Sequence, residues 1–220
     1  MRSLAPIETT YLRDEAFRQL RTAIVSGALP PGAPLVIDQL AASFGLSSMP
    51  VREAVKRLVA DGLVEELPRR AHRVAPLTRA SALDVLEIVG TLMIRAYEIG
   101  VPALDDAGVA AMRAAFDAAC ARAEEGDLTG ALASIHVMHG VVYAATGNPE
   151  FERTIGAIGP RFDRVLYLWY TGSLSDVRSS YRGELVEAIE AGRRDEAVVI
   201  MRNAWRRLRD VIASREDDSA

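Results

Sequence analysis

Residues Ser47 to Leu63 read S-S-M-P-V-R-E-A-V-K-R-L-V-A-D-G-L, and this stretch decides the fold. Its apolar side chains recur every three or four residues, which is the spacing of one helix face. They are Val51, Ala54, Val55, Leu58 and Val59. Ser47 and Ser48 are good helix caps, and Pro50 is tolerated in a first turn. Gly62 ends the pattern, so the spacing predicts an amphipathic helix.

The opposite face of this helix carries hydrogen-bond donors. Ser48, Arg52 and Lys56 are four residues apart, so they stand in one exposed row. Glu53 and Arg57 are placed to pair beside them. A short helix with an apolar back and a donor-rich front has the form that enters a DNA major groove. The alternative is an ordinary solvated face, and the flanking sequence decides between the two.

Two further helices are predicted before this stretch. The first runs from Thr9 to Ser26. The following A-L-P-P-G-A-P-L holds too many prolines for regular structure and predicts a rigid connector. Asp38 is the expected N-cap of a short second helix, which Gly45 ends. Together with the helix of 47–63, this short helix makes a helix-turn-helix.

A hairpin is predicted after the helix-turn-helix. Leu63 to Leu67 and His72 to Ala75 form two strands around P-R-R-A, with two arginines near the tip. The result is a winged helix-turn-helix, on which a basic wing usually lies along a phosphate backbone. Solvated loop charge is the other explanation of these arginines. The side chains expected to contact DNA are Ser47, Ser48, Arg52, Lys56, Arg69, Arg70 and His72.

The charge of the chain is divided unevenly. The 220 residues have a formal net charge of −4, but residues 1–76 hold 10 basic and 8 acidic side chains. Residues 77–220 hold 16 basic and 22 acidic side chains. The first part is therefore weakly basic, which permits DNA binding without demanding it. No apolar run has the length of a membrane span, and the single cysteine, Cys120, excludes an intrachain disulfide, so we expect a soluble cytoplasmic protein.

The second part is expected to be all-α. A long helix capped by Thr78 or Ser81 runs to about Gly100, and helical segments follow near 105–125, 127–146, 149–171, 175–191 and 194–214. The predicted fold is mainly α, with a DNA-binding domain at 1–76 and a helical bundle at 77–214. The bundle is expected to bind an effector and to dimerise, and residues 215–220 are expected to be a disordered tail.

The sequence resembles the GntR family of bacterial transcriptional regulators. The resemblance lies in I-V-S-G-A-L-P-P-G-A-P-L, in L-A-A-S-F-G-L-S-S-M-P-V-R-E-A-V-K-R-L and in D-G-L-V. The helical remainder resembles the sensor domain of the FadR subgroup, called the FCD domain. This resemblance implies a homodimer that binds a palindromic operator and responds to a small metabolite, and we expect a repressor. It implies a base-reading role for Arg52, a hydroxyl contact to DNA for Ser47 and a wing contact for Arg70.

The chain departs from the family motif at the DNA contacts. Where the motif commonly has Arg-Thr before proline, this chain has Ser48 and Met49, and the wing glycine is Ala71. Losing an arginine that could clasp guanine removes about 1–3 kcal/mol of discrimination. We therefore expect an operator that differs from the usual one or is bound less tightly.

A second departure concerns metal binding. Many members of the subgroup hold a divalent metal with an Asp or Asn and three histidines. The motif H-G-V-V-Y-A-A-T-G-N-P places His139 on one histidine, whereas Ile135, Arg182 and Ala204 stand at the other positions. A metal needs three or four N, O or S donors, and a protonated arginine cannot supply one. We therefore predict no metal and no other cofactor.

Arg182 is the expected replacement for the metal. His139 shares a helical stripe with Ile135, and Arg182 lies on the apolar stripe of its own helix, where a guanidinium needs a counter-charge. We expect Arg182 to anchor a carboxylate or phosphate effector, with His139 as a second donor. The alternatives for Arg182 are an internal pair with an acid such as Glu184 or Asp163, or a side chain that extends to solvent near the start of its helix. The alternative for His139 is a core histidine with its hydrogen bonds satisfied. The expected ligand-binding residues are Val89, Ile135, His139, Arg182 and Ala204.

Three other functions remain as alternatives. An enzyme is disfavoured, because the sequence has no G-x-S-x-G, P-loop, dinucleotide fingerprint or H-E-x-x-H. A metal-dependent sensor would use His136 and His139 together with Asp163 or Glu184. An effector-free regulator would use its helical domain for dimerisation only.

Overall fold

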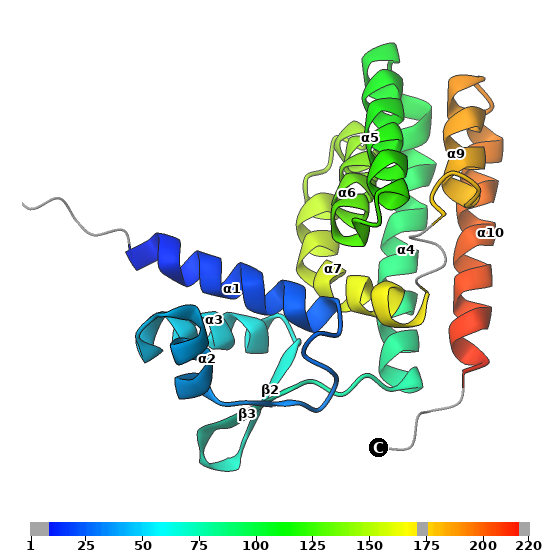
Figure 1. Ribbon diagram of the computed structural model, residues 1–220. Helices are drawn as coiled ribbons and strands as arrows, with labels where there is room; N and C mark the ends of the chain where they lie inside the picture. The colour runs from blue at the N-terminus through cyan, green and yellow to red at the C-terminus, as the bar shows by residue number, and fades with distance from the viewer. Residues whose placement is uncertain (1–8, 171–175, 216–220) are drawn as a thin grey trace, which may run out of the picture. The chain divides into compact units, whose positions relative to one another are not determined.

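The computed structural model describes residues 9–170 and 176–215 (Figure 1). The chain divides into two compact units, Met1–Pro76 and Leu77–Ala220, and each is considered by itself. The mainly α fold, with a winged helix-turn-helix followed by a helical bundle, is confirmed. The predicted tail at 215–220 lies outside the described residues except for Arg215.

The first unit is a three-helix core with a small sheet. In chain order its elements are α1 (Thr9–Val25), β1 (Pro34–Leu35), α2 (Ile37–Phe44), α3 (Ser48–Ala60), β2 (Val64–Leu67), a 3-10 turn (Pro68–Arg70) and β3 (Ala71–Val74). The strands are antiparallel in the order β1-β3-β2. Helix α3 packs against α1 and α2, and β2 and β3 form the wing (Figure 1).

Two local predictions for this unit were wrong. The proline-rich connector includes β1, in which Pro34 pairs with Arg73 and Leu35 with His72. Proline lacks an N–H but is tolerated on an edge strand, and Leu35 is buried in the core. Helix α2 is capped by Val36 rather than Asp38, and the Asp38 carboxylate contacts α3 instead.

The second unit consists of helices in the described residues. They are α4 (Arg79–Ala103), α5 (Asp106–Glu124), α6 (Leu128–Ala145), α7 (Glu150–Trp169), α9 (Tyr181–Glu190) and α10 (Arg194–Ala213). Helix α4 packs against α6, α7 and α10 (Figure 1). The predicted cap of α4 forms as a reciprocal capping box of Thr78 and Ser81. The helix expected from residue 175 begins only at Tyr181, because Ser180 caps it and Asp176 holds the preceding turn.

Helix α6 contains no charged residue along its 18 positions. By length and apolarity alone it could cross a membrane, but 44% of it is buried inside the helical unit. Its buried side includes Ile135, Met138, His139 and Val142, so α6 serves as a core helix of this unit.

Glycine permits the close approach of α4 to α6. A Cβ atom at Gly100 of α4 would overlap the backbone carbonyl oxygen of Val142 in α6. By contrast, a Cβ atom at Gly140 of α6 would meet nothing within 4 Å. The two glycines therefore differ in packing although both are helical.

This difference predicts opposite effects of the same substitution. Gly100→Ala should lower the free energy of unfolding by about 1–3 kcal/mol, because α4 and α6 must separate. Gly140→Ala should raise it by about 0.5–1 kcal/mol, because alanine is the better helix former. Urea denaturation followed by circular dichroism measures both, and equal effects of the two substitutions would contradict this packing.

Candidate DNA-binding surface and sensor core

The packing of α3 determines which of its side chains face solvent. Val51, Ala54, Val55 and Leu58 are no more than 1% exposed, and they form the core of the first unit with α1. The predicted row on the opposite side of the helix is present, since Arg52 and Lys56 are exposed and Ser48 is half-exposed. Arg52 makes no hydrogen bond or ion pair with the described part of the chain, so its guanidinium is available to a partner.

The charged neighbours of this row pair differently from the prediction. Lys56 pairs with Glu53 at 2.8 Å, and this hydrogen bond lowers the pKa of the Glu53 carboxyl. Arg57 reaches α1 instead, where it donates to Asp14 Oδ1 at 2.6 Å and lies 3.9 Å from the centre of the Phe17 ring. The predicted Glu53–Arg57 pair is therefore wrong, and Arg57 helps to hold α3 against α1.

The start of α3 presents hydroxyl and apolar groups. Ser47 is the extended N-cap residue, and its exposed side chain makes no capping hydrogen bond. Ser48 Oγ donates to Asp38 Oδ1 at 2.7 Å. Met49, which follows Ser48, is 72% exposed. No local pattern in the sequence indicated the Asp38 contact, because these residues belong to two different helices.

The predicted DNA contacts of the wing differ in position and burial. Arg69 is exposed at the tip and has a φ of 63°, in the left-handed region that favours glycine. Arg70 follows in the same turn, and its side chain is outside the description. His72 is half-buried on β3, and its Nδ1 atom is enclosed without a hydrogen-bond partner among the described residues. Only the remaining edge of the His72 ring can therefore reach DNA.

The left-handed backbone of Arg69 predicts that two substitutions with the same loss of charge will differ in stability. Arg69→Gly should raise the free energy of unfolding by about 1 kcal/mol, because it removes the Cβ atom from a left-handed residue. Arg69→Ala loses the same charge but keeps the Cβ atom, so it should give no such gain. Urea denaturation measures both variants, and equal stabilisation by alanine would show that charge repulsion, rather than backbone strain, acts at this tip.

A buried polar cluster lies in the helical unit. We define it as Tyr97 of α4, His139 and Tyr143 of α6, and Tyr181 and Arg182 of α9. Tyr181 is half-buried, and the other four are buried. The Tyr97 hydroxyl lies 2.6 Å from His139 Nδ1, and the rings of His139 and Tyr143 stack at 6.5 Å. The Arg182 guanidinium lies 4.7 Å from the centre of the Tyr181 ring. Sequence analysis placed His139 and Arg182 inside the bundle but missed the three tyrosines around them.

Burial determines the protonation of this cluster. Burial, and then the charge of nearby Arg182, lower the pKa of His139 well below its usual value, so the imidazole is neutral. Burial also raises the pKa of Tyr97, so the phenol keeps its proton. Among the described residues His139 is the one hydrogen-bond partner of this hydroxyl, so we assign Tyr97 as the donor to Nδ1. A neutral imidazole then carries its proton on Nε2, where it is a hydrogen-bond donor.

The other predicted ligand-binding residues are also inside the helical unit. Val89, Ile135 and Ala204 are 0%, 2% and 7% exposed, and they lie on α4, α6 and α10. The buried charged side chains of the described residues are Asp163, Arg164 and Arg182, each 3% exposed. Burial lowers the pKa of Arg164 to about 10, which leaves it protonated. Asp163 and Arg164 lie on α7, whereas Arg182 lies on α9 within the polar cluster.

The residues present do not fit a divalent metal. His139 Nδ1 contacts Tyr97, whereas His136 Nε2 contacts Asp163 Oδ1 at 2.8 Å, so the two histidines serve different partners. Glu184, another predicted donor, is exposed. No three His, Cys, Asp or Glu side chains of residues 9–170 and 176–215 are grouped to hold an ion.

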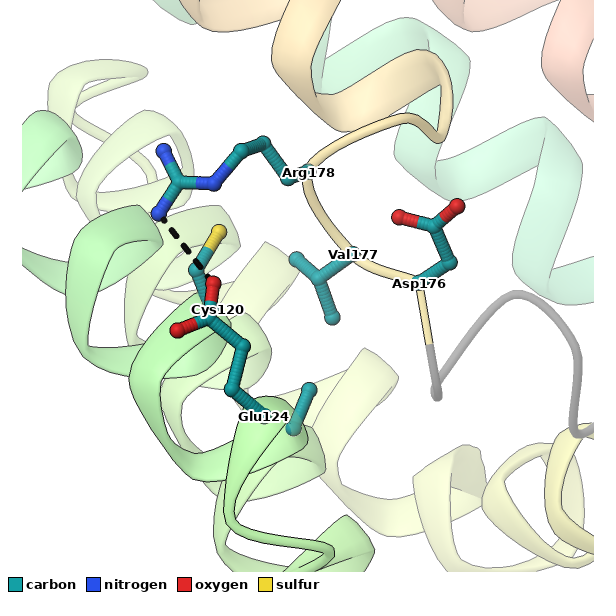
Figure 2. Close-up of a pocket in the computed structure, with 6 residues that line it drawn as sticks. Cys120, Glu124, Asp176, Val177 and Arg178 are labelled. Carbon is teal, nitrogen blue, oxygen red and sulfur yellow. Dashed lines mark ion pairs between the residues drawn. The ribbon is translucent and has the colours of Figure 1, made fainter.

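A small hollow elsewhere in this unit is too small for a metabolite (Figure 2). It has a volume of about 30 Å³ and lies between α5 and the turn before α9. Figure 2 shows the Arg178 guanidinium reaching toward Glu124, with which it forms an ion pair at 3.6 Å. Cys120 is buried beside the hollow, and burial raises the pKa of its thiol. Ligand pockets have volumes of about 300–1,000 Å³, so this hollow can hold water but not a metabolite.

Comparison with known proteins gives the same two-part division. Residues 12–74 match "Bacterial regulatory proteins, gntR family", and residues 84–207 match the FCD domain. The "Probable D-xylose utilization operon transcriptional repressor" of Paenarthrobacter nicotinovorans is 31% identical over 175 residues, which cover 77% of this chain and 74% of that protein.

Two further similarities agree with this match. An "Uncharacterized HTH-type transcriptional regulator" of Agrobacterium vitis is 32% identical over 133 residues, which cover 59% of this chain and 77% of that protein. The crystal structure of a transcriptional regulator GntR from Rhodococcus sp. RHA1 shares the fold, with a TM-score of 0.75 and 19% identity. The match covers 93% of this chain and 99% of that chain.

Proposed function

This chain belongs to the GntR family of bacterial regulatory proteins and carries an FCD domain, and from that premise we propose a homodimeric repressor controlled by a small anionic metabolite. Regulators of this family bind DNA operators and respond to small-molecule effectors, and they are not enzymes. The relative from Paenarthrobacter is named a repressor, which supports repression here. The cytoplasm, where bacterial DNA lies, is the proposed location.

The proposed DNA contact is made by α3 and the wing, one set from each subunit on a palindromic operator. The observation that carries this proposal is the exposed guanidinium of Arg52, which projects from a helix whose opposite face is fully buried. Arginine reads guanine through two parallel hydrogen bonds in the major groove. Ser47, Lys56, Arg69, Arg70 and the free edge of His72 are proposed to contact phosphates or nearby bases.

Substitution of Arg52 tests the DNA-binding surface. Arg52→Ala should weaken binding to the selected operator by about tenfold or more while leaving weak, salt-sensitive binding to random DNA. The matched control is Arg153→Ala, which removes an exposed arginine from α7 of the helical unit. Fluorescence anisotropy with operator and random duplexes measures both. An equal loss on both duplexes would show that Arg52 binds phosphate and does not read a base.

The proposed effector site is the buried polar cluster. Arg182 supplies a positive charge there, and the assigned tautomer of His139 supplies an N–H donor beside it. A guanidinium and an N–H donor are the groups that bind a carboxylate or a phosphate. Val89, Ile135 and Ala204 are proposed to form apolar walls where related proteins have polar ligands. The donor set supports a sensor without a metal, since a protonated Nε2 offers an anion a proton and offers a metal no lone pair.

An anionic effector bound by Arg182 should no longer stabilise a variant that lacks this guanidinium. In a thermal-shift panel of carboxylic and phosphorylated metabolites, a ligand at 100 times its Kd stabilises the wild type by about 2.7 kcal/mol. Arg182→Met should lose this shift and keep operator binding, because the guanidinium is absent and the side chain still fills the core. Arg161→Met, on an exposed arginine of α7, is the control. D-xylose is the neutral comparison, given the name of one relative.

Three outcomes would contradict this proposal. Failure of Arg182→Met to fold would show that Arg182 pairs with an internal acid. Stabilisation by neutral sugars alone would contradict an anionic ligand. Stoichiometric zinc, nickel or manganese in protein purified without chelators would contradict a metal-free sensor.

A further inference from the structure

Ser48, the first residue of α3, has a hydroxyl whose proton is engaged in a hydrogen bond within the protein. Ser48 Oγ donates to Asp38 Oδ1 at 2.7 Å, and Asp38 lies in the first turn of α2, which packs against α3. A carboxylate has no proton to give, so the proton in this hydrogen bond belongs to the serine. Both side chains reach solvent at this end of α3.

The direction of this hydrogen bond limits what Ser48 can recognise. A hydroxyl has one proton and two lone pairs, and with its proton held by Asp38 it offers only acceptors. Phosphate oxygens are also acceptors and are negatively charged, so the Asp38 carboxylate beside Ser48 repels them. This pair is therefore unsuited to a phosphate contact and suited to a hydrogen-bond donor.

The donors that DNA presents in its major groove are few. They are the exocyclic amino groups, N4 of cytosine and N6 of adenine, whereas guanine and thymine present acceptors there. The N-terminal residues of a recognition helix are those that contact base edges. Ser48 has this position on α3, and Arg52 stands one turn further along the same row.

We propose that Ser48 and Asp38 form an acceptor pair that reads an amino base, adenine or cytosine, in each half of the operator. This inference rests on the proposed binding of DNA through α3. An arginine at position 48, which the family motif commonly has, donates hydrogen bonds and reads guanine. The pair in this chain has the opposite hydrogen-bond polarity, so the preference at that base is inverted rather than merely weakened.

A complete base-substitution panel tests the inference. The operator is first selected from genomic DNA with the full-length protein, and each position of a half-site is then replaced by all four bases. Dissociation constants are measured by fluorescence anisotropy at one salt concentration. At one position, the wild type should bind adenine or cytosine about fivefold more tightly than guanine or thymine, as expected for one hydrogen bond.

Substitutions of Ser48 and Asp38 test whether these residues cause the preference for adenine or cytosine. Ser48→Ala should reduce this preference to within about twofold at that position and leave the others unchanged. Asp38→Asn should relax it as well, because an amide can donate to Ser48 and leave the hydroxyl proton free to face DNA. The double variant Asp38→Ala, Ser48→Arg should prefer guanine there. Ser43→Ala, whose hydroxyl donates to the backbone of α2, is the matched control and should change nothing.

The outcomes separate this inference from the proposed function. Specific operator binding with a pattern that Ser48→Ala does not change overturns the acceptor pair and leaves the proposed function standing. Equal weakening of operator and random duplexes by Ser48→Ala overturns it too, because that result indicates a phosphate contact. Absence of any sequence-specific binding by the wild type overturns both.

Discussion

The burial of one face of α3 is the constraint on which the DNA-binding surface depends. Val51 and Leu58 are fully buried, and a helix with a fixed period turns the opposite residues, Arg52 and Lys56, to solvent. A rotation of α3 by one residue, about 100°, would bury a charge and expose the core. Arg57 adds an ion pair and a ring contact to α1 against such rotation. Stability of the unit and orientation of the surface therefore have one physical cause.

Elements with local causes were predictable from sequence, and elements with distant partners were not. The amphipathic period located α3, and the capping residues Thr78 and Ser81 located the start of α4. Strand β1 forms only because β3 offers it hydrogen bonds and the core takes up Leu35, so the proline-rich sequence concealed it. Lys56 and Arg57 are both within reach of Glu53 along the helix, and spacing did not show that Arg57 would instead contact Asp14 of α1.

The buried polar cluster also combines features that local sequence predicts with features that depend on distant contacts. Helical spacing placed His139 and Arg182 in the interior, because each lies on an apolar stripe of its own helix. Spacing could not show that Tyr97, 42 residues before His139, would supply the proton that sets the imidazole tautomer. The tautomer on which the proposed anion site depends thus follows from a contact between helices. The sequence suggested an anionic effector only because Ile135, Arg182 and Ala204 stand where related proteins have metal ligands.

The face of α2 and α3 that we propose contacts DNA carries two cations, Arg52 and Lys56, and two anions, Asp38 and Glu53. A surface with this balance gains little from the uniform negative charge of the chromosome, where non-specific binding is almost wholly electrostatic. The wing, with Arg69 and Arg70, should therefore supply most of the non-specific affinity, whereas α2 and α3 contribute mainly to the choice of sequence.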